Sequence, residues 1–248
     1  LNHACLIDGI RACGKPREIF AHAALPPRSQ RTSPALIVSE SLFGMDGTIA
    51  NVEAYAADLN DGDILLIDEA HALGVFGPEG AGFARELNDP RIVILGTLGK
   101  AIGTAGGFIA GPSALIEVLI NAARTFVFDT APPPGLAFAS RVAIMLARSA
   151  GDRRARLFSN VEYLREALRS AGVAVPERAT PIVPIVLGSE AAALAAMQHA
   201  REKRVNAPAI RPPTVPADSS RLRISVRADH SREHFDMLMD ALACTVTS

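Results

Sequence analysis

Reactive side chains follow two short apolar segments of the chain. Asp68 and His71 come directly after the aliphatic residues 64–67, and Lys100 follows the aliphatic residues 92–95 through a glycine-rich turn. Polar groups just past the carboxyl end of a strand face the ligand crevice of an open parallel sheet. A lysine there can hold an aldehyde as a Schiff base, and an aspartate can keep a ring nitrogen protonated. Together the two residues indicate pyridoxal phosphate.

Each of these residues also has a plain structural interpretation. An acid after a strand is commonly a helix cap, and a lysine is most often a surface residue. Several glycines surround Lys100, however, and glycine costs chain entropy unless the backbone must approach something closely or adopt an unusual φ. The cluster that favours a ligand site consists of Gly96, Gly99, Gly103, Gly106 and Gly107.

A different interpretation starts from the same acidic segment. Four aliphatic residues followed by Asp-Glu-Ala-His resemble the metal-binding strand of a helicase-type P-loop ATPase. Such an enzyme also needs a G-x-x-x-x-G-K-[ST] loop, whose backbone N–H groups cradle phosphates. The Gly-Lys pair after the strand predicted at 92–95, Gly99-Lys100, has Ile94 in place of the first glycine and Ala101 in place of the Ser or Thr. A P-loop ATPase fragment remains an alternative.

Short apolar segments alternate with segments of helical period, which predicts an α/β fold with a mostly parallel sheet flanked by helices. Strands covered on both faces are expected at residues 35–38, 64–67, 92–95 and 107–110, and helices at 49–59, 112–123 and 136–150. After Gly151 the pattern predicts a helix, then strand 182–187, helix 190–203, strand 222–226 and helix 231–242. We therefore expect a large domain over residues 1–150 and a smaller α/β domain over residues 151–248.

Charge balance and composition exclude several classes of protein. Lys plus Arg number 25 against 26 Asp plus Glu, so no nucleic-acid or anionic-membrane partner is indicated. Glycines and a proline break the longest uncharged stretch, residues 101–116, which argues against a membrane-spanning helix. The cysteines (Cys5, Cys13 and Cys244) form no C-x-x-C pair, and His3 with Cys5 lacks the further ligands of a metal site. We expect a cytoplasmic globular protein with free thiols and no metal.

The motifs around these residues resemble the α-oxoamine synthases, fold-type I pyridoxal-phosphate enzymes that join an amino acid to an acyl-CoA. The resemblance covers nearly the whole chain. Its C-terminal string, residues 209–216, is most similar to the family members that act in biotin biosynthesis. The other motifs are Asn2-His3-Ala4-Cys5, Phe43-Gly44-Met45-Asp46-Gly47, Asp68-Glu69-Ala70-His71, Thr97-Leu98-Gly99-Lys100 and Arg221-Leu222-Arg223.

The resemblance implies a catalytic set of Lys100, Asp68 and His3. Lys100 would hold the cofactor as a Schiff base and later move the substrate α-proton. Asp68 would pair with the pyridine nitrogen, and His3 would stack on the ring face. His71 would bind the ring hydroxyl, and Thr97 would donate a hydrogen bond to the cofactor phosphate.

Three further positions match family residues that bind the cofactor or the substrate, and two positions depart from the family pattern. Thr130 would reach the cofactor phosphate of the partner subunit. Arg223 would clamp the substrate carboxylate, as suits a bidentate guanidinium, and Thr214 would close over the substrate. Gly44 lies where the family usually has a cofactor-binding serine, so it can offer only its backbone. Asp129, often a serine in the family, is electrostatically awkward beside a phosphate unless it turns away.

For the whole enzyme, the resemblance implies decarboxylative condensation of L-alanine with pimeloyl-CoA or a pimeloyl carrier-protein thioester, in a homodimer whose site lies at the subunit interface. One alternative is an α-oxoamine synthase that uses glycine or serine, and another is a truncated module without activity. The family normally carries about a hundred more residues before the position of Leu1. These supply a helix N-terminus for the phosphate, so we expect an N-terminal part to be missing.

Overall fold

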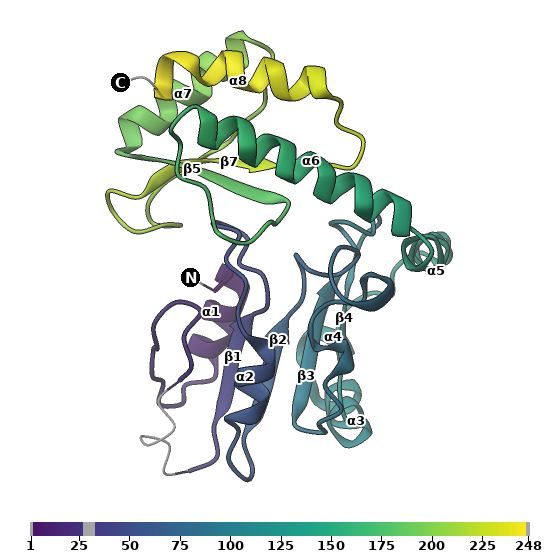
Figure 1. Ribbon diagram of the computed structural model, residues 1–248. Helices are drawn as coiled ribbons and strands as arrows, with labels where there is room; N and C mark the ends of the chain where they lie inside the picture. Colours follow the sequence, from purple (N-terminus) through teal and green to yellow (C-terminus); the bar gives the residue numbers. More distant parts are fainter. Residues whose placement is uncertain (1, 27–32, 247–248) are drawn as a thin grey trace. The chain divides into compact units, whose positions relative to one another are not determined.

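The computed structural model describes residues 2–26 and 33–246, which form two compact units (Figure 1). The N-terminal unit comprises Asn2–Phe43 and Ile49–Ala150, and the C-terminal unit comprises Gly44–Thr48 and Gly151–Ser248. Each unit has its own sheet. The fold is α/β, as the sequence predicts.

The N-terminal unit is built on a four-stranded sheet. Its strands β1 (Leu36–Glu40), β2 (Ile64–Asp68), β3 (Ile92–Thr97) and β4 (Gly107–Ala110) lie in the order β1-β2-β3-β4. The first three are parallel and β4 is antiparallel to β3. All four strands were predicted, and the mostly parallel arrangement is confirmed. Parallel strands that follow each other in this way bring their carboxyl ends to one edge of the sheet.

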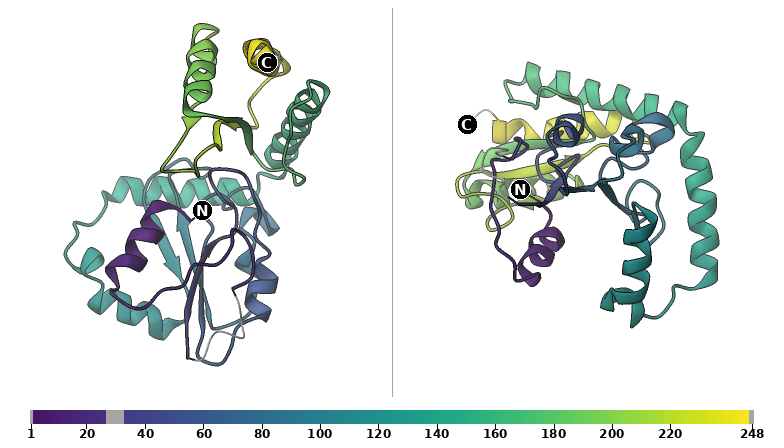
Figure 2. Two further views of the ribbon diagram at one scale, coloured as in Figure 1. Left: turned by 90° about the vertical axis from the view of Figure 1, so that its left-hand side faces the viewer. Right: turned by 90° about the horizontal axis from the view of Figure 1, so that it is seen from below.

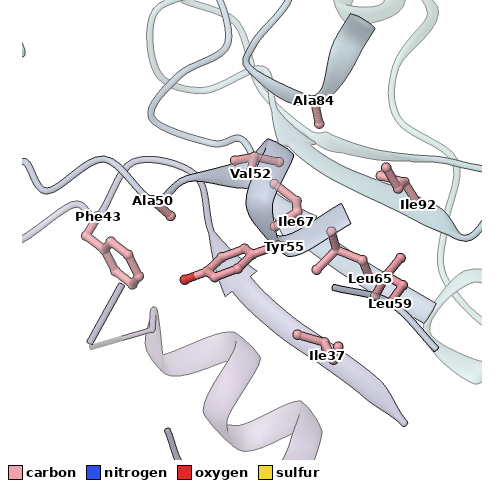
Figure 3. Packing of buried hydrophobic residues seen from close by; sticks show 10 residues of the cluster. All are labelled: Ile37, Phe43, Ala50, Val52, Tyr55, Leu59, Leu65, Ile67, Ala84 and Ile92. Atoms are coloured by element: carbon pink, nitrogen blue, oxygen red, sulfur yellow. The ribbon is translucent and has the colours of Figure 1, made fainter. Parts of the chain in front are cut away.

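Helix α2 (Val52–Ala57) packs over β1 and β2 to form the core of this unit (Figure 3). It begins at Asn51, whose side chain accepts a hydrogen bond of 2.9 Å from the backbone N–H of Ala54 and so satisfies one free donor of the first turn. The helix fills the space above the aliphatic strands, and the shared core holds the strand ends rigidly. The labelled core residues are Ile37, Phe43, Ala50, Val52, Tyr55, Leu59, Leu65, Ile67, Ala84 and Ile92.

The other helical elements of this unit include both predicted and unpredicted ones. Helices α3 (Ser113–Ala122) and α5 (Pro134–Arg148) were predicted, whereas α1 (Ala4–Ala12) and α4 (Arg124–Val127) were not. Two short 3-10 turns, η2 (Pro78–Gly80) and η3 (Ala84–Glu86), follow β2. Helix α1 was not predicted because its N-cap is His3, whose ring accepts from the N–H of Cys5, rather than a common capping residue.

Strand β4 differs from the expectation that it is covered on both faces. All four of its residues are exposed in the described part of the chain. Helices α3, α4 and α5 bury among them only Ser140. The sequence does carry the apolar residues of a covered strand, but Phe108 and Ile109 stay 36% and 43% exposed in the described part of the chain. We call residues 107–148 the β4–α5 region.

The C-terminal unit contains a small antiparallel sheet with helices on one face (Figures 1 and 2). The strands β5 (Ile182–Gly188), β6 (Ala209–Ile210) and β7 (Ser220–Ser225) lie in the order β5-β7-β6. Helices α6 (Gly151–Ser170), α7 (Glu190–Glu202) and α8 (Arg232–Val246) pack together over it. Only the two-residue β6 was not predicted, because so short a strand has no readable period.

Helix α6 shows why this unit is well packed. Its buried residues Leu157, Val161, Leu164 and Leu168 recur at the spacing of one helix face. Helix α7 contributes alanines, which let it approach the sheet closely. None of the helices in the described residues is long and apolar enough to cross a membrane. Cys5 and Cys13 are free thiols, and the Cys244 side chain lies outside the described residues.

Candidate active site

Three polar residues end the three parallel strands of the N-terminal unit. Glu40 ends β1, Asp68 ends β2 and Thr97 ends β3. Glu40 and Asp68 are direct neighbours in the β1–β2 register. The edge formed by these strand ends is where open α/β sheets bind ligands.

Asp68 begins the turn that carries His71. The Asp68 side chain is 7% exposed, and its Oδ1 accepts a hydrogen bond of 2.8 Å from the N–H of Ala70. The carbonyl of Glu69 accepts from the N–H groups of Ala72 and Leu73 at 3.0 and 2.8 Å. These local bonds fix the turn, so that the acid and the imidazole have defined positions three residues apart.

Lys100 meets this turn from the neighbouring strand. Its Nζ lies 3.1 Å from Nε2 of His71, within hydrogen-bond distance. Because an amine and an imidazole at this distance share a hydrogen bond, a proton can move between the two nitrogens. The structure therefore brings His71 and Lys100 together from two different strand ends, and Asp68 begins the turn that carries His71.

The turn around Lys100 is shaped by its glycines and by Thr97. The N–H of Leu98 donates to the carbonyl of Gly106, and Thr97 Oγ1 donates to that same carbonyl at 3.3 Å. Thr97 Oγ1 also accepts from the N–H of Gly99 at 3.3 Å. At Gly96, a Cβ atom would collide with the ring of Phe108. The glycine there is thus required by β4 and not by a ligand.

His3 is tied to the same strand edge through its backbone. The His3 N–H donates to Oε1 of Glu40 at 2.6 Å, and Nδ2 of Asn2 donates to the carbonyl of Val38 at 3.0 Å. The His3 ring contacts Cys5 through Nδ1, which lies 3.0 Å from Sγ. Burial raises the pKa of the Cys5 thiol, and the charge of Asp68 raises it further, which links α1 electrostatically to Asp68.

Two buried carboxylates were not predicted as part of the site. Glu40 is 3% exposed and anchors His3, and Glu69 is 1% exposed beside Asp68. Burial raises the pKa of Glu69, although hydrogen bonds from Ser41 and from the backbone of Ala84 and Phe83 oppose the shift. The available signal for Glu40 was its place two residues past the strand predicted at 35–38, an argument similar to the one that selected Asp68.

The remaining predicted residues lie elsewhere. Thr130 is exposed between α4 and α5, and its N–H donates to Oδ1 of Asp129 at 2.8 Å, so that the Asp129 carboxylate folds back on the chain. Gly44 and Arg223 meet in the C-terminal unit, where Nη1 of Arg223 donates to the Gly44 carbonyl at 3.2 Å. Thr214 is exposed in that unit, and its N–H donates to the carbonyl of Arg211 at 3.1 Å.

Comparison with known proteins identifies the family. The model of the family described as aminotransferase class I and II matches residues 21–242. The chain belongs to this family. Membership rules out the P-loop ATPase alternative, and the local structure agrees, since strand β4 and not a helix follows Gly99-Lys100.

Curated relatives of this family confirm the resemblance drawn from the motifs. The chain is 42% identical over 99% of its length to 8-amino-7-oxononanoate synthase of Methylococcus capsulatus, and 43% identical over 98% to that of Halorhodospira halophila. It spans 66% and 63% of the length of these two relatives.

Solved structures of the family confirm the fold. Serine palmitoyltransferase of Sphingomonas wittichii superposes with a TM-score of 0.88 at 30% identity, covering 98% of this chain and 64% of that one. 8-Amino-7-oxononanoate synthase of Francisella tularensis superposes with a TM-score of 0.86 at 26% identity, covering 99% of this chain and 72% of that one.

Proposed function

We propose that the chain carries the cofactor and substrate site of a pyridoxal-phosphate-dependent 8-amino-7-oxononanoate synthase. The net reaction joins the α-carbon of L-alanine to the acyl carbon of pimeloyl-CoA or of a pimeloyl carrier-protein thioester, and releases CO2 and the free thiol. Relatives with this name at about 40% identity support the assignment. The observation that carries it is the contact between Lys100 Nζ and His71 Nε2 beside the buried carboxylate of Asp68.

The residues at the strand ends fit pyridoxal phosphate chemically. Lys100 offers a primary amine for an imine bond, and His71 offers an imidazole within reach of that amine. Asp68 is nearly buried, with one carboxylate oxygen bound to Ala70, and a carboxylate in this position suits a ring N–H. When bound, the cofactor supplies an electron sink that stabilises negative charge on the substrate α-carbon.

Each residue then has a defined task. Lys100 accepts the α-proton of the amino acid on Nζ and returns it to the product. His71, whose Nε2 lies 3.1 Å from that nitrogen, binds the ring hydroxyl. Asp68 holds a proton on the ring nitrogen by its negative charge. His3, held by Glu40, covers the ring face. Thr97 supplies a hydroxyl near the phosphate position, once it exchanges its present bond to the Gly106 carbonyl.

Substrate recognition is assigned to the C-terminal unit. Arg223 binds the alanine carboxylate through its guanidinium. Its Nε is buried without a hydrogen-bond partner among the described residues, which leaves donor capacity for a carboxylate. Thr214, exposed and near Arg211, is the residue that would close over the substrate.

The working protein is further proposed to be a cytoplasmic homodimer. Most of the exposed large apolar side chains of the described residues lie in the β4–α5 region, and such a surface is rarely left in water. A second copy would cover part of it and bring Thr130 to the partner's cofactor phosphate. The free thiols of Cys5 and Cys13 suit a reducing compartment. The exposed residues are Phe108, Ile109, Val118, Ile120, Phe126, Val127, Phe128, Phe138, Val142, Ile144, Met145 and Leu146.

The cofactor assignment is tested by trapping the imine. The chain contains only three lysines, Lys15, Lys100 and Lys203, so borohydride reduction after incubation with pyridoxal phosphate has few targets. We expect peptide mass spectrometry to find the label on Lys100, and Lys100→Ala to abolish it. Lys15→Arg and Lys203→Arg serve as controls that keep the label. Equal labelling of all three lysines would contradict the assignment.

A second candidate is an α-oxoamine synthase that uses serine or glycine. The superposition on serine palmitoyltransferase favours it, but at 30% identity against 42–43% for the oxononanoate synthases. The two candidate functions are distinguished by titrating L-alanine, glycine or L-serine into the protein with bound pyridoxal phosphate and measuring the change in cofactor absorbance. The proposed function requires L-alanine to bind best. A clear preference for serine would instead support the serine-using synthase.

A further inference from the structure

Glu69 is a buried acid that the proposed chemistry does not use. Its carboxylate binds two segments from different parts of the N-terminal unit. Ser41 Oγ, just past the end of β1, donates to Oε2 at 2.7 Å, and the N–H of Ala84, which begins η3, donates to Oε1 at 2.6 Å. Hydrogen bonds to a charged acceptor are stronger than neutral ones, so this acid links the β1 end to the loop after β2.

The backbone of Glu69 is held just as firmly on both sides. Its N–H donates to the carbonyl of Leu95 on β3 at 2.9 Å. The carbonyl of Asp68, in the peptide that joins the two acids, accepts from the N–H of Ser41 at 3.0 Å. Ser41 therefore binds both the Asp68–Glu69 peptide and the Glu69 side chain, and the direction of the Asp68 side chain depends on this peptide.

The loop that faces Glu69 leaves room for this acid and for little else. Gly82 has a φ of +91°, and a Cβ there would lie 2.8 Å from both the carboxyl carbon and Oε2 of Glu69. Glycine is thus required at position 82 both for its backbone conformation and for the close approach to the carboxylate. The loop at Gly82 therefore packs closely against the Glu69 carboxylate.

We infer that Glu69 is a positioning residue, which fixes the carboxylate of Asp68 and the turn bearing His71 at the ends of the parallel strands. The inference rests on the proposed function, since Asp68 matters there as the partner of the ring nitrogen. Glu69 acts through hydrogen bonds to Ser41 and Ala84 and does not touch the cofactor itself. Losing them would leave buried donors unpaired and let the Asp68 turn move.

The test compares Glu69→Gln with Glu79→Gln, an exposed glutamate on the same loop that pairs with Arg148. An amide at position 69 presents an N–H₂ to one of two donors, so one hydrogen bond is lost with little change in volume. The first readout is hydrogen exchange of the Ala70 N–H, which is bound to Asp68 Oδ1. We expect about tenfold faster exchange in Glu69→Gln and no change in Glu79→Gln.

The second readout uses pyridoxal phosphate labelled with ¹⁵N and bound to the full chain. In Glu69→Gln we expect the ring nitrogen to lose its proton at a lower pH than in the unchanged chain. The cofactor should still be trapped on Lys100 by borohydride. The inference would be overturned if Glu69→Gln lowered only the melting temperature. In that case the Ala70 N–H exchange rate and the pH at which the ring nitrogen loses its proton would be unchanged. If the unchanged chain binds no cofactor, the proposed function fails, whereas unchanged Ala70 exchange refutes the positioning role independently of cofactor binding.

Discussion

Helices α6 and α5 differ in what they bury, although both are long. Helix α6 in the C-terminal unit buries a regular stripe against the sheet, with Leu164 and Leu168 fully inaccessible. Helix α5 in the β4–α5 region carries at least as many large apolar side chains, yet its only buried residue is Ser140. An apolar helix face therefore indicates that burial would be favourable. Whether that face is buried depends on the elements that pack against the helix.

The largest effect is expected from truncating a leucine on α6, and the matching truncation on α5 serves as the comparison. Leu164→Ala leaves a cavity in the packed core of the C-terminal unit and should lower the free energy of unfolding by about 3 kcal/mol. Leu146→Ala removes a side chain that is 57% exposed and should change it by less than about 0.5 kcal/mol. Urea denaturation measures both. Equal losses would mean that α5 is covered in solution, for example by a second copy of the chain.

Two arginine ion pairs sharpen the same contrast. Arg165 on α6 is buried and donates to Glu162 and to the carbonyls of Pro176 and Glu177, each at 2.6 Å. Arg165→Ala leaves these carbonyls without their donor and should cost about 2 kcal/mol.

The matching change on α5 is Arg148→Ala. Arg148 pairs with Glu79 at 2.8 Å, but both side chains are more than half exposed. Water and salt screen such a pair, so we expect a loss below about 0.5 kcal/mol that disappears in 1 M salt. Chemical denaturation at low and high salt separates the two arginines. A salt-dependent loss for Arg165→Ala would contradict the burial argument.

A further small effect is expected from acid titration of the Asp229–Arg227 pair. Arg227 lowers the pKa of Asp229 from 3.8 to about 2 through their hydrogen bonds. The pair therefore stabilises the folded state above pH 4, and this contribution is lost as the pH falls through about 2. Because both side chains are well exposed, Asp229→Asn should cost less than about 1 kcal/mol at neutral pH. The difference from the unchanged chain should vanish below pH 2 in thermal melts.

Local sequence patterns predicted most of the helices and strands, and they selected the site residues that follow the parallel strands. The strands were recognised because each is a short aliphatic segment between turn residues, and Asp68, His71 and Lys100 were selected because they follow such strands. Their closeness was expected from the topology, and the 3.1 Å contact between Lys100 and His71 agrees with it. Whether each residue performs its assigned role stays a prediction.

The unpredicted features depend on contacts between distant segments. Glu40 and Glu69 are defined by donors 37 and 15 residues away, on His3 and Ala84, and no local pattern encodes such partners. The exposure of β4 was missed because an aliphatic strand looks the same in sequence whether or not another element covers it. A resemblance to a family supplied roles for Thr130, Thr214 and Arg223, which their local sequence alone would not have suggested.

The short segment Gly44–Thr48 gives the chain a particular order of assembly. It belongs to the C-terminal unit, where Gly47 packs against Thr180 and Ile182 too tightly for any side chain and Gly44 binds Arg223. During synthesis it leaves the ribosome about a hundred residues before the rest of its unit, at a time when the surrounding N-terminal unit can already begin to fold. A gene fragment that starts at Gly151 would encode the three helices and the sheet but not this segment, so the C-terminal unit cannot be excised as one continuous stretch.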